Sequence, residues 1–142
     1  MKKIIVIDDS PIILRTVEEL LRKAGFEVLK AEDGLSGLDL IKKNTDCDLI
    51  IVDLNMPKMG GFEMLDEMYE EEICIDRPVI IFTTESIVVK ENALKVREKK
   101  KSTGRKTWYV KPLTEERYEN FLDTVNAMLE SSDWYNEKET YY

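Results

Sequence analysis

The sequence predicts an α/β fold in which five parallel strands alternate with five helices in an open, doubly wound sheet. Three observations support this prediction. Short apolar runs recur along the chain, these runs are continuous rather than alternating, and segments with helical periodicity lie between them. Continuous apolar runs are typical of strands buried on both faces, as in a parallel sheet covered by helices. The chain of 142 residues suits one domain.

The five strands are predicted from the apolar runs at residues 4–7, 26–29, 49–52, 79–82 and 108–110. The first, third and fourth runs are the strongest, because they consist mainly of isoleucine, valine and leucine. Each is short enough for a strand and is bounded by polar residues or proline. The order of strands and helices therefore predicts the repeating βα arrangement of an open parallel sheet.

Helical periodicity is clearest at 11–24 and 114–130. Ser10 is the predicted N-cap of the first helix, Pro11 occupies its first position and Gly25 ends it. Thr114 is the predicted N-cap of the last helix. The apolar stripes that should face the sheet are Ile13, Val17, Leu20, Leu21 and Ala24 in the first helix, and Tyr118, Phe121, Leu122, Val125, Met128 and Leu129 in the last.

Shorter helices are predicted at 34–43, 61–71 and 87–98. Residues 131–142 lack periodicity, so we expect a domain at 1–130 followed by a C-terminal tail. No apolar run approaches the roughly 18 residues that span a bilayer, and the run at 4–7 is too short for a signal peptide. We therefore expect a cytoplasmic protein without membrane insertion.

Charge and cysteine content narrow the possible functions. The net charge of −8 argues against direct nucleic-acid binding. Residues 90–111 nevertheless carry +7, which leaves −15 on the rest of the chain. This basic segment either docks on an acidic surface or forms a solvated helix end and loop. Cys47 and Cys74, in a chain without histidine, predict free, partly buried thiols rather than a zinc site.

Polar residues of particular kinds stand at the carboxyl ends of the long predicted strands. They are Asp8 and Asp9 after the first strand, Asp53 after the third, Thr83 after the fourth and Lys111 after the fifth. Ligands bind at this edge of an open parallel sheet, where the winding direction reverses. If the strand order is 2-1-3-4-5, the three carboxylates converge at the reversal. Each residue alone has a structural alternative, as a cap, a strand-end hydroxyl or a loop lysine, but their joint placement favours a site.

Three converging carboxylates have a specific chemistry. They repel one another, so at least one takes up a proton unless cations intervene. Mg²⁺ suits such a cluster, because it prefers hard oxygen ligands and retains several waters. Lys111 supplies a second positive charge, and Thr83 can donate its hydroxyl. A pocket of this kind can accept a phosphoryl group on one carboxylate, since the metal and the ammonium neutralise the phosphoryl oxygens.

The segments around these strand ends form a recognisable set. They read IIVIDDS at 4–10, IIVDLNMPKMGG at 50–61, VIIFTTE at 79–85 and YVKP at 109–112. The set resembles the receiver domains of bacterial two-component systems, and the resemblance extends from Lys2 to about Glu130. The chain resembles single-domain, CheY-like response regulators, and a relay shuttle or an adaptor for another kinase is an equal alternative. This resemblance implies a flavodoxin-like sheet of order 2-1-3-4-5.

The resemblance also implies a role for each site residue. Asp53 is the expected phosphoacceptor, and Thr83 and Lys111 are expected to hold the phosphoryl group. The expected Mg²⁺ ligands are Asp9, Asp53 and the backbone carbonyl of Asn55, with Asp8 assisting directly or through water. Thr83 and Trp108 are the expected switch residues, and Asn55 and Glu85 are expected to tune dephosphorylation. The Lys111–Pro112 bond is expected to be cis.

Four features depart from the family's usual pattern. Gly60 stands where an acidic residue or Asn usually precedes the glycine, Trp108 replaces the usual Tyr or Phe, and Thr84 replaces Ala or Gly. The stretch from Thr83 to Lys111 is also longer than usual, with the extra residues expected at 98–106. Trp108 has a larger ring than Tyr, so it is expected to switch less completely.

Three functions fit these observations. The first is a phosphorylation-activated switch that receives its phosphoryl group from a histidine kinase or phosphotransfer protein. It would signal to another protein through the face formed by residues 87–98, the strand at 108–110 and the helix at 114–130. The second is a Mg²⁺-dependent phosphohydrolase, although Asn55 stands where such enzymes carry a general acid. The third is a constitutive interaction module that accepts no phosphate. Intact site residues favour the switch, but the cognate kinase and the downstream target are open.

Overall fold

The computed structural model describes residues 1–84 and 104–130. Five parallel strands form one sheet in the order β2-β1-β3-β4-β5, which confirms the predicted flavodoxin-like arrangement. The strands are β1 (Lys3–Ile7), β2 (Glu27–Ala31), β3 (Leu49–Asp53), β4 (Val79–Thr83) and β5 (Lys106–Val110). The helices are α1 (Pro11–Lys23), α2 (Gly34–Lys43), α3 (Gly61–Glu70), the 3-10 turn η1 (Glu115–Arg117) and α5 (Tyr118–Leu129). The predicted helix at 87–98 and the tail at 131–142 lie outside the described residues.

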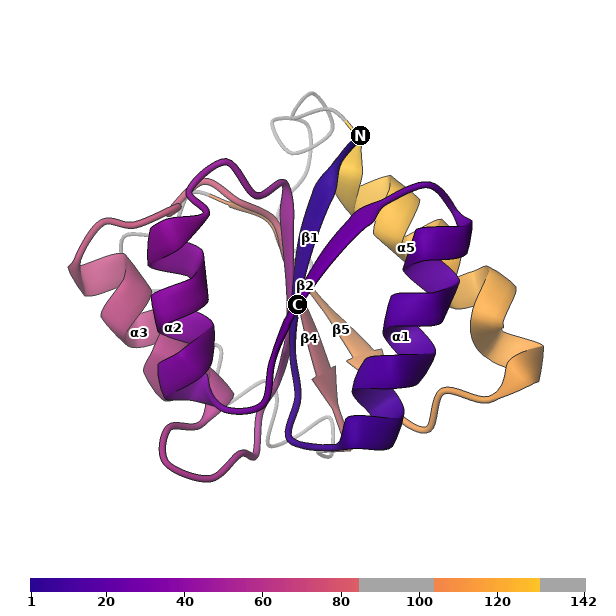
Figure 1. Cartoon of the computed structure of the whole chain (residues 1–142), viewed down its shortest axis with the longest axis horizontal. Helices are drawn as coiled ribbons and strands as arrows, with labels where there is room; N and C mark the ends of the chain where they lie inside the picture. Colours follow the sequence, from indigo (N-terminus) through magenta and orange to yellow (C-terminus); the bar gives the residue numbers. More distant parts are fainter. Residues whose placement is uncertain (85–103, 131–142) are drawn as a thin grey trace.

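Helices cover both faces of the sheet. Figure 1 shows α1 and α5 on one face and α2 and α3 on the other. Every residue of β3 and β4 is buried, which accounts for their continuous apolar sequences. The alternation of side chains along each strand divides the core into two clusters, one beneath each pair of helices. In the part of the chain that the structure describes, no helix is long and apolar enough to cross a bilayer.

The first helix confirms most of its predicted signals. The Ser10 side chain accepts a hydrogen bond from the N–H of Ile13 at 3.3 Å, and Gly25 adopts a φ of 95° just beyond the helix end. The predicted apolar stripe is wrong at one position. Ala24 is exposed, because it is the C-cap and the helix has already ended at Lys23. Leu14, which the prediction omitted, is buried instead.

The predicted cap of the last helix is also wrong. Thr114 precedes the 3-10 turn, and its side chain makes no capping hydrogen bond. The N–H of Arg117 bonds to the Thr114 carbonyl at 2.9 Å, which tightens this segment into a 3-10 turn. The α-helix therefore starts only at Tyr118, with Arg117 in the N-cap position.

Two residues of the basic segment are buried rather than solvated. One terminal nitrogen of Arg105, Nη2, donates to the carbonyls of Ala127, Met128 and Glu130 at 3.0, 2.8 and 3.2 Å, which caps the end of α5. The Lys106 ammonium lies 4.7 Å from the centre of the Tyr69 ring, and burial lowers the pKa of Lys106 to about 8. Both cations therefore act inside the fold and neither is available to an acidic partner.

Both cysteines are free, as predicted, with Cys47 buried and Cys74 half-buried. Burial raises the pKa of the Cys47 thiol to about 12. A buried thiol with a pKa this high stays protonated near neutral pH and is therefore a poor nucleophile.

The first turn of α3 lies directly against the end of β3. Gly61 donates its N–H to the Leu54 carbonyl at 2.8 Å. A Cβ atom on Gly61 would lie 2.3 Å from the Asp53 carbonyl oxygen and 3.1 Å from the Leu54 Cα. Both neighbours are backbone atoms and cannot rotate away, so only glycine permits this approach. The contact determines how closely the helix packs behind the Asp53 side chain.

We therefore expect Gly61→Ala to lower the free energy of unfolding by about 1–3 kcal/mol, because the added methyl group forces the backbone apart. Intrinsic preference acts in the opposite direction, since alanine is favoured over glycine within helices by about 1 kcal/mol. Equilibrium urea unfolding measures the difference. Leu35→Ala, at an exposed position in the first turn of α2, is the control and should change stability by less than about 0.5 kcal/mol. Unchanged or increased stability of Gly61→Ala would contradict the packing described.

Candidate functional site

The polar residues at the strand ends meet at one edge of the sheet. The strand order places β1 between β2 and β3, so the chain segments after β1 and β3 are neighbours. Asp8 and Asp9 follow β1, and Asp53 ends β3. One carboxylate oxygen from each of these three residues lies within 4.8 Å of the others. Asp8 and Asp53 are buried and Asp9 is exposed, so the cluster extends from the core to solvent.

The Lys111 ammonium lies between the two buried carboxylates. Its Nζ atom is 3.0 Å from Asp8 Oδ2 and 3.4 Å from Asp53 Oδ1. It also lies 5.3 Å from the centre of the Phe82 ring, which forms an apolar wall. Burial alone would lower the pKa of Lys111, but the ion pairs with Asp8 and Asp53 outweigh it and raise the pKa. Lys111 is therefore charged at neutral pH.

The Asp53 carboxyl has an unusual proton affinity. Burial raises its pKa most, and the neighbouring Asp8 charge raises it further. Lys111 opposes both effects, but the pKa still rises to about 6 from its ordinary value of 3.8. One lysine is thus too little positive charge for this cluster. An added cation would favour the ionised form of Asp53.

Asp8 has one satisfied oxygen and one that faces the cluster. Its Oδ1 accepts a hydrogen bond from the N–H of Ser10 at 2.9 Å, which holds the carboxylate in a fixed orientation. Its Oδ2 is buried and lies 3.0 Å from the Lys111 ammonium, which leaves it directed into the cluster. A buried oxygen of this kind, together with two other carboxylates, fits a hard divalent cation such as Mg²⁺. The residues present therefore suit the predicted metal.

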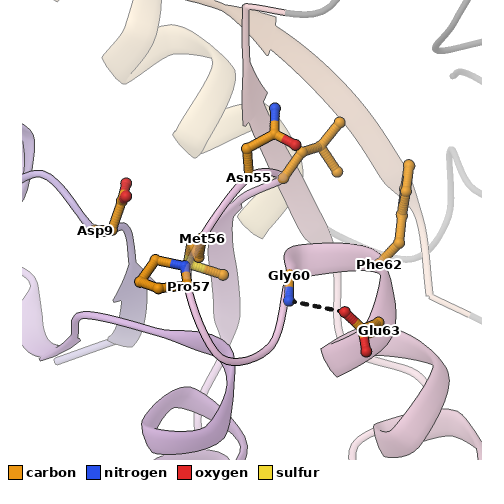
Figure 2. Close-up of a pocket in the computed structure, with 8 residues that line it drawn as sticks. Asp9, Asn55, Met56, Pro57, Gly60, Phe62 and Glu63 are labelled. Atoms are coloured by element: carbon orange, nitrogen blue, oxygen red, sulfur yellow. Dashed lines mark hydrogen bonds between the residues drawn. The ribbon is translucent and has the colours of Figure 1, made fainter.

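An open depression of about 510 Å³ adjoins the acidic cluster. Figure 2 shows Asp9 on one side of it, and Phe62 and Glu63 of α3 on the other. The loop between β3 and α3 completes the lining with Leu54, Asn55, Met56, Pro57 and Gly60. The Gly60 N–H donates to Glu63 Oε1 at 3.3 Å, so Glu63 caps the helix where Gly60 offers no side chain.

The loop between β3 and α3 is also attached to the start of α2. The Gly34 N–H donates to the Met59 carbonyl at 3.0 Å, and Lys58 Nζ lies 3.7 Å from Asp33 Oδ2. The Ser36 N–H, and then Lys58, lower the pKa of Asp33. No pattern in the sequence predicts these contacts, because they join segments that are far apart along the chain. They fix the loop that carries Asn55.

The remaining predicted residues are placed as follows. Thr83 is fully buried at the end of β4, and its carbonyl accepts a hydrogen bond from the Lys111 N–H at 2.9 Å. Trp108, in β5, makes an edge-to-face contact with Phe62 at 6.1 Å between ring centres, so it lies on the α3 side of the sheet. The Lys111–Pro112 bond is cis, as predicted. Glu85 lies outside the described residues.

A cluster of acidic residues paired with a lysine, at the carboxyl edge of a 2-1-3-4-5 parallel sheet, defines a receiver-type domain. Residues 4–118 match the response regulator receiver domain. The chain belongs to this family, and its relatives are CheY-like single-domain response regulators. The predicted identification is thereby confirmed.

Particular relatives agree over most of the chain. A chemotaxis protein CheY homolog of Campylobacter jejuni is 35% identical over 125 residues, which cover 87% of this chain and 91% of the relative. The structure of chemotaxis protein CheY4 of Vibrio cholerae matches with a TM-score of 0.76 at 34% identity, covering 90% of this chain and 98% of that one. The response regulator protein TrrA of Thermotoga maritima, solved in complex with Mg²⁺-BeF, has a TM-score of 0.71 at 25% identity, covering 90% and 99%.

The raised pKa of Asp53 predicts a dependence of stability on pH. The folded protein holds this proton more tightly than the unfolded chain does, so ionising Asp53 costs stability. The cost is absent below about pH 4, grows as the pH rises from 3.8 to about 6, and is complete above it. In Mg²⁺-free buffer near neutral pH, Asp53→Asn should therefore be more stable than the natural chain by about 1–3 kcal/mol.

Urea unfolding of the two proteins across pH 4–8 measures this difference, which should vanish at the acidic end. Asp48→Asn, immediately before the same strand, is the control. Its carboxylate accepts the Lys3 N–H at 2.8 Å, so the change should not raise stability. A constant difference between Asp53→Asn and the natural chain at all pH values would contradict the assignment.

Proposed function

We propose that this receiver domain is a switch that accepts a phosphoryl group on Asp53 in a Mg²⁺-dependent reaction. The observation that carries the proposal is the position of the Lys111 ammonium, 3.0 Å from Asp8 and 3.4 Å from Asp53 in a cluster with surplus negative charge. A lysine shared by two buried acids is poised to hold the oxygens of a new phosphoryl group. CheY-like receiver domains are signalling switches rather than classical enzymes, which supports this choice.

The residues proposed to hold Mg²⁺ are Asp8, Asp9, Asp53 and the backbone carbonyl of Asn55. The carboxylate oxygens are grouped within 4.8 Å, and Asn55 lines the depression beside Asp9. The described complex of TrrA with Mg²⁺-BeF supports the choice of ion for a relative of this fold. When bound, the ion would supply positive charge that stabilises ionised Asp53 and the phosphoryl oxygens.

The proposed transfer uses the other site residues directly. A carboxylate oxygen of Asp53 forms a bond to phosphorus as the phosphorus–nitrogen bond of a phosphohistidine breaks. The donor would be a histidine kinase or a phosphotransfer protein in the cytoplasm. Lys111 would pair with one phosphoryl oxygen and the Thr83 hydroxyl would donate to another. Asn55 and Glu85 would flank the water that later hydrolyses the acyl phosphate, and so set its lifetime.

The phosphorylated domain is proposed to signal to a downstream protein by direct contact. Phosphorylation adds about −1.5 to −2 charges and would draw Thr83 toward the phosphoryl group. Trp108, two strand positions before the end of β5, would respond to that movement. The proposed docking face combines β5 and α5 with the predicted helix at 87–98. The downstream protein is of unidentified class, because motility regulators, relay shuttles and adaptors use the same receiver chemistry.

Phosphorylation itself is the direct test. Treatment with acetyl phosphate and Mg²⁺ should add one phosphoryl group to the natural chain and none to Asp53→Asn, as judged by intact mass. Asp48→Asn, which changes the residue before the opposite end of the same strand, should be modified like the natural chain. Steady hydrolysis of the donor without an adduct would favour the phosphohydrolase, and no reaction at all would favour the constitutive module.

Mg²⁺ affinity tests the proposed metal ligands. Asp9→Ala should weaken Mg²⁺ binding by at least about tenfold and leave the fold intact, because Asp9 is exposed and supplies one of three carboxylates. Isothermal titration calorimetry measures the affinity, and circular dichroism checks the fold. Asp46→Ala removes an exposed carboxylate that pairs with Lys3 at 2.9 Å, away from the cluster. It should bind Mg²⁺ like the natural chain, and equal affinity in both variants would refute the role of Asp9.

A further inference from the structure

Arg117, the last residue of the 3-10 turn η1, binds the loop that carries Lys111. One of its guanidinium nitrogens, Nη1, donates to the Val110 carbonyl at 2.6 Å and also to the Pro112 carbonyl. These two carbonyls belong to the residues immediately before and after Lys111. A single nitrogen thus spans the backbone on both sides of the lysine, outside the set of residues proposed to contact the phosphoryl group.

The guanidinium is itself fixed by the aromatic core. It lies 4.5 Å from the centre of the Tyr109 ring, and the Tyr109 hydroxyl donates to the Arg117 carbonyl at 3.3 Å. Tyr109 in turn packs edge-to-face on Phe121 at 5.2 Å and against Phe82 at 5.6 Å. Phe82 is the ring beside the Lys111 ammonium. Arg117 therefore connects the loop backbone to the same aromatic cluster that borders the lysine side chain.

These contacts leave the Lys111 backbone with little freedom. Its own N–H is bonded to the Thr83 carbonyl at the end of β4, and the flanking carbonyls are bonded to Arg117. Because the stem of a lysine side chain is flexible, a backbone held on both sides of Lys111 removes one source of variation in the position of the ammonium. The 3.4 Å separation from Asp53 is already longer than an ideal ion pair, so a shift of the loop away from Asp53 would break the contact.

We propose that Arg117 is a positioning residue for Lys111: by binding the carbonyls of Val110 and Pro112, it holds the ammonium where it meets the phosphoryl group on Asp53. This inference rests on the proposed function. Arg117 acts through Lys111 and contacts neither the carboxylates nor the transferred group. Its removal should slow phosphoryl transfer, because displacement of a charge-stabilising group by about 1 Å can cost up to about a hundredfold in rate.

The experiment measures two quantities on each variant, the rate of Asp53 phosphorylation and the Mg²⁺ affinity. Acetyl phosphate is the donor, so the Asp53–phosphorus bond forms as a phosphorus–oxygen bond breaks and acetate leaves. Arg117→Met retains packing over Tyr109 but has no donor, and should be slower by at least about fivefold. Arg117→Lys restores one nitrogen that can reach both carbonyls, and should be intermediate. Mg²⁺ affinity should stay within about twofold for both, because Arg117 does not contact the acidic cluster.

Arg77 provides a matched control. It also bonds two backbone carbonyls, with Nε to Cys47 at 2.7 Å and Nη2 to Thr45 at 2.7 Å, but before β3 begins. Arg77→Met should phosphorylate at the natural rate within about twofold, even if it lowers the melting temperature as much as Arg117→Met does. If Arg117→Met does not fold, Arg117→Gln replaces it with the same expectation, because the shorter amide cannot span both carbonyls.

A double variant separates the positioning of Lys111 by Arg117 from a general loss of folded structure. In a Lys111→Ala background, Arg117→Met should change the phosphorylation rate by less than about twofold, since the group that it positions is gone. An equal loss in both backgrounds, a rate like that of Arg77→Met, or a parallel loss of Mg²⁺ affinity would each overturn the inference. If the natural chain forms no adduct, the proposed function fails instead. An adduct on the natural chain with an unaffected Arg117→Met rejects only the role of Arg117.

Discussion

The Lys111 ammonium, held between Asp8 and Asp53 from two neighbouring strands, is the interaction on which this edge of the protein depends. Two buried carboxylates side by side would be strongly unfavourable without a cation. A single lysine compensates them only in part, and the exposed Asp9 adds further negative charge. The pKa of Asp53 near 6 is the measure of that remaining imbalance. The site therefore folds with an excess of negative charge. That excess favours the binding of a divalent cation, or of a phosphoryl group together with its counter-ions.

The backbone beside Asp53 is held by close contacts between backbone atoms of neighbouring segments. Gly61 allows α3 to pack against the Asp53 carbonyl, and Gly34 bonds the Met59 carbonyl from the start of α2. The fully buried strands β3 and β4 supply the rigid support, and the loops that carry function are attached to it at these few points. Substitutions far from the acidic cluster can therefore displace it, because the loops have little independent packing of their own.

Successive residues of β5 pack in different halves of the core. Trp108 contacts Phe62 on the α2 and α3 side, whereas Tyr109 packs with Phe82 and Phe121 on the α1 and α5 side. This follows from the alternation of side chains along a strand. Phe62 lines the depression beside Asn55, and Tyr109 supports Arg117 and the Lys111 loop. The two sides of one strand thus connect the site to two separate packed clusters.

The sequence by itself determined the strands, the sheet class and the strand-end polar residues, because each depends on local composition and on spacing along the chain. The sequence predicted helix ends and caps less well, because these short segments adjust to the residues packed around them. Periodicity alone did not exclude Ala24 from the core or include Leu14, and Thr114 has a good capping side chain that the 3-10 turn leaves unused. Only the tertiary structure decided the distances within the Asp8, Asp53 and Lys111 cluster, the raised pKa of Asp53, and the attachment of Arg117 to the loop. These properties arise from contacts between side chains and backbone atoms that folding alone brings together, so no pattern along the chain encodes them separately.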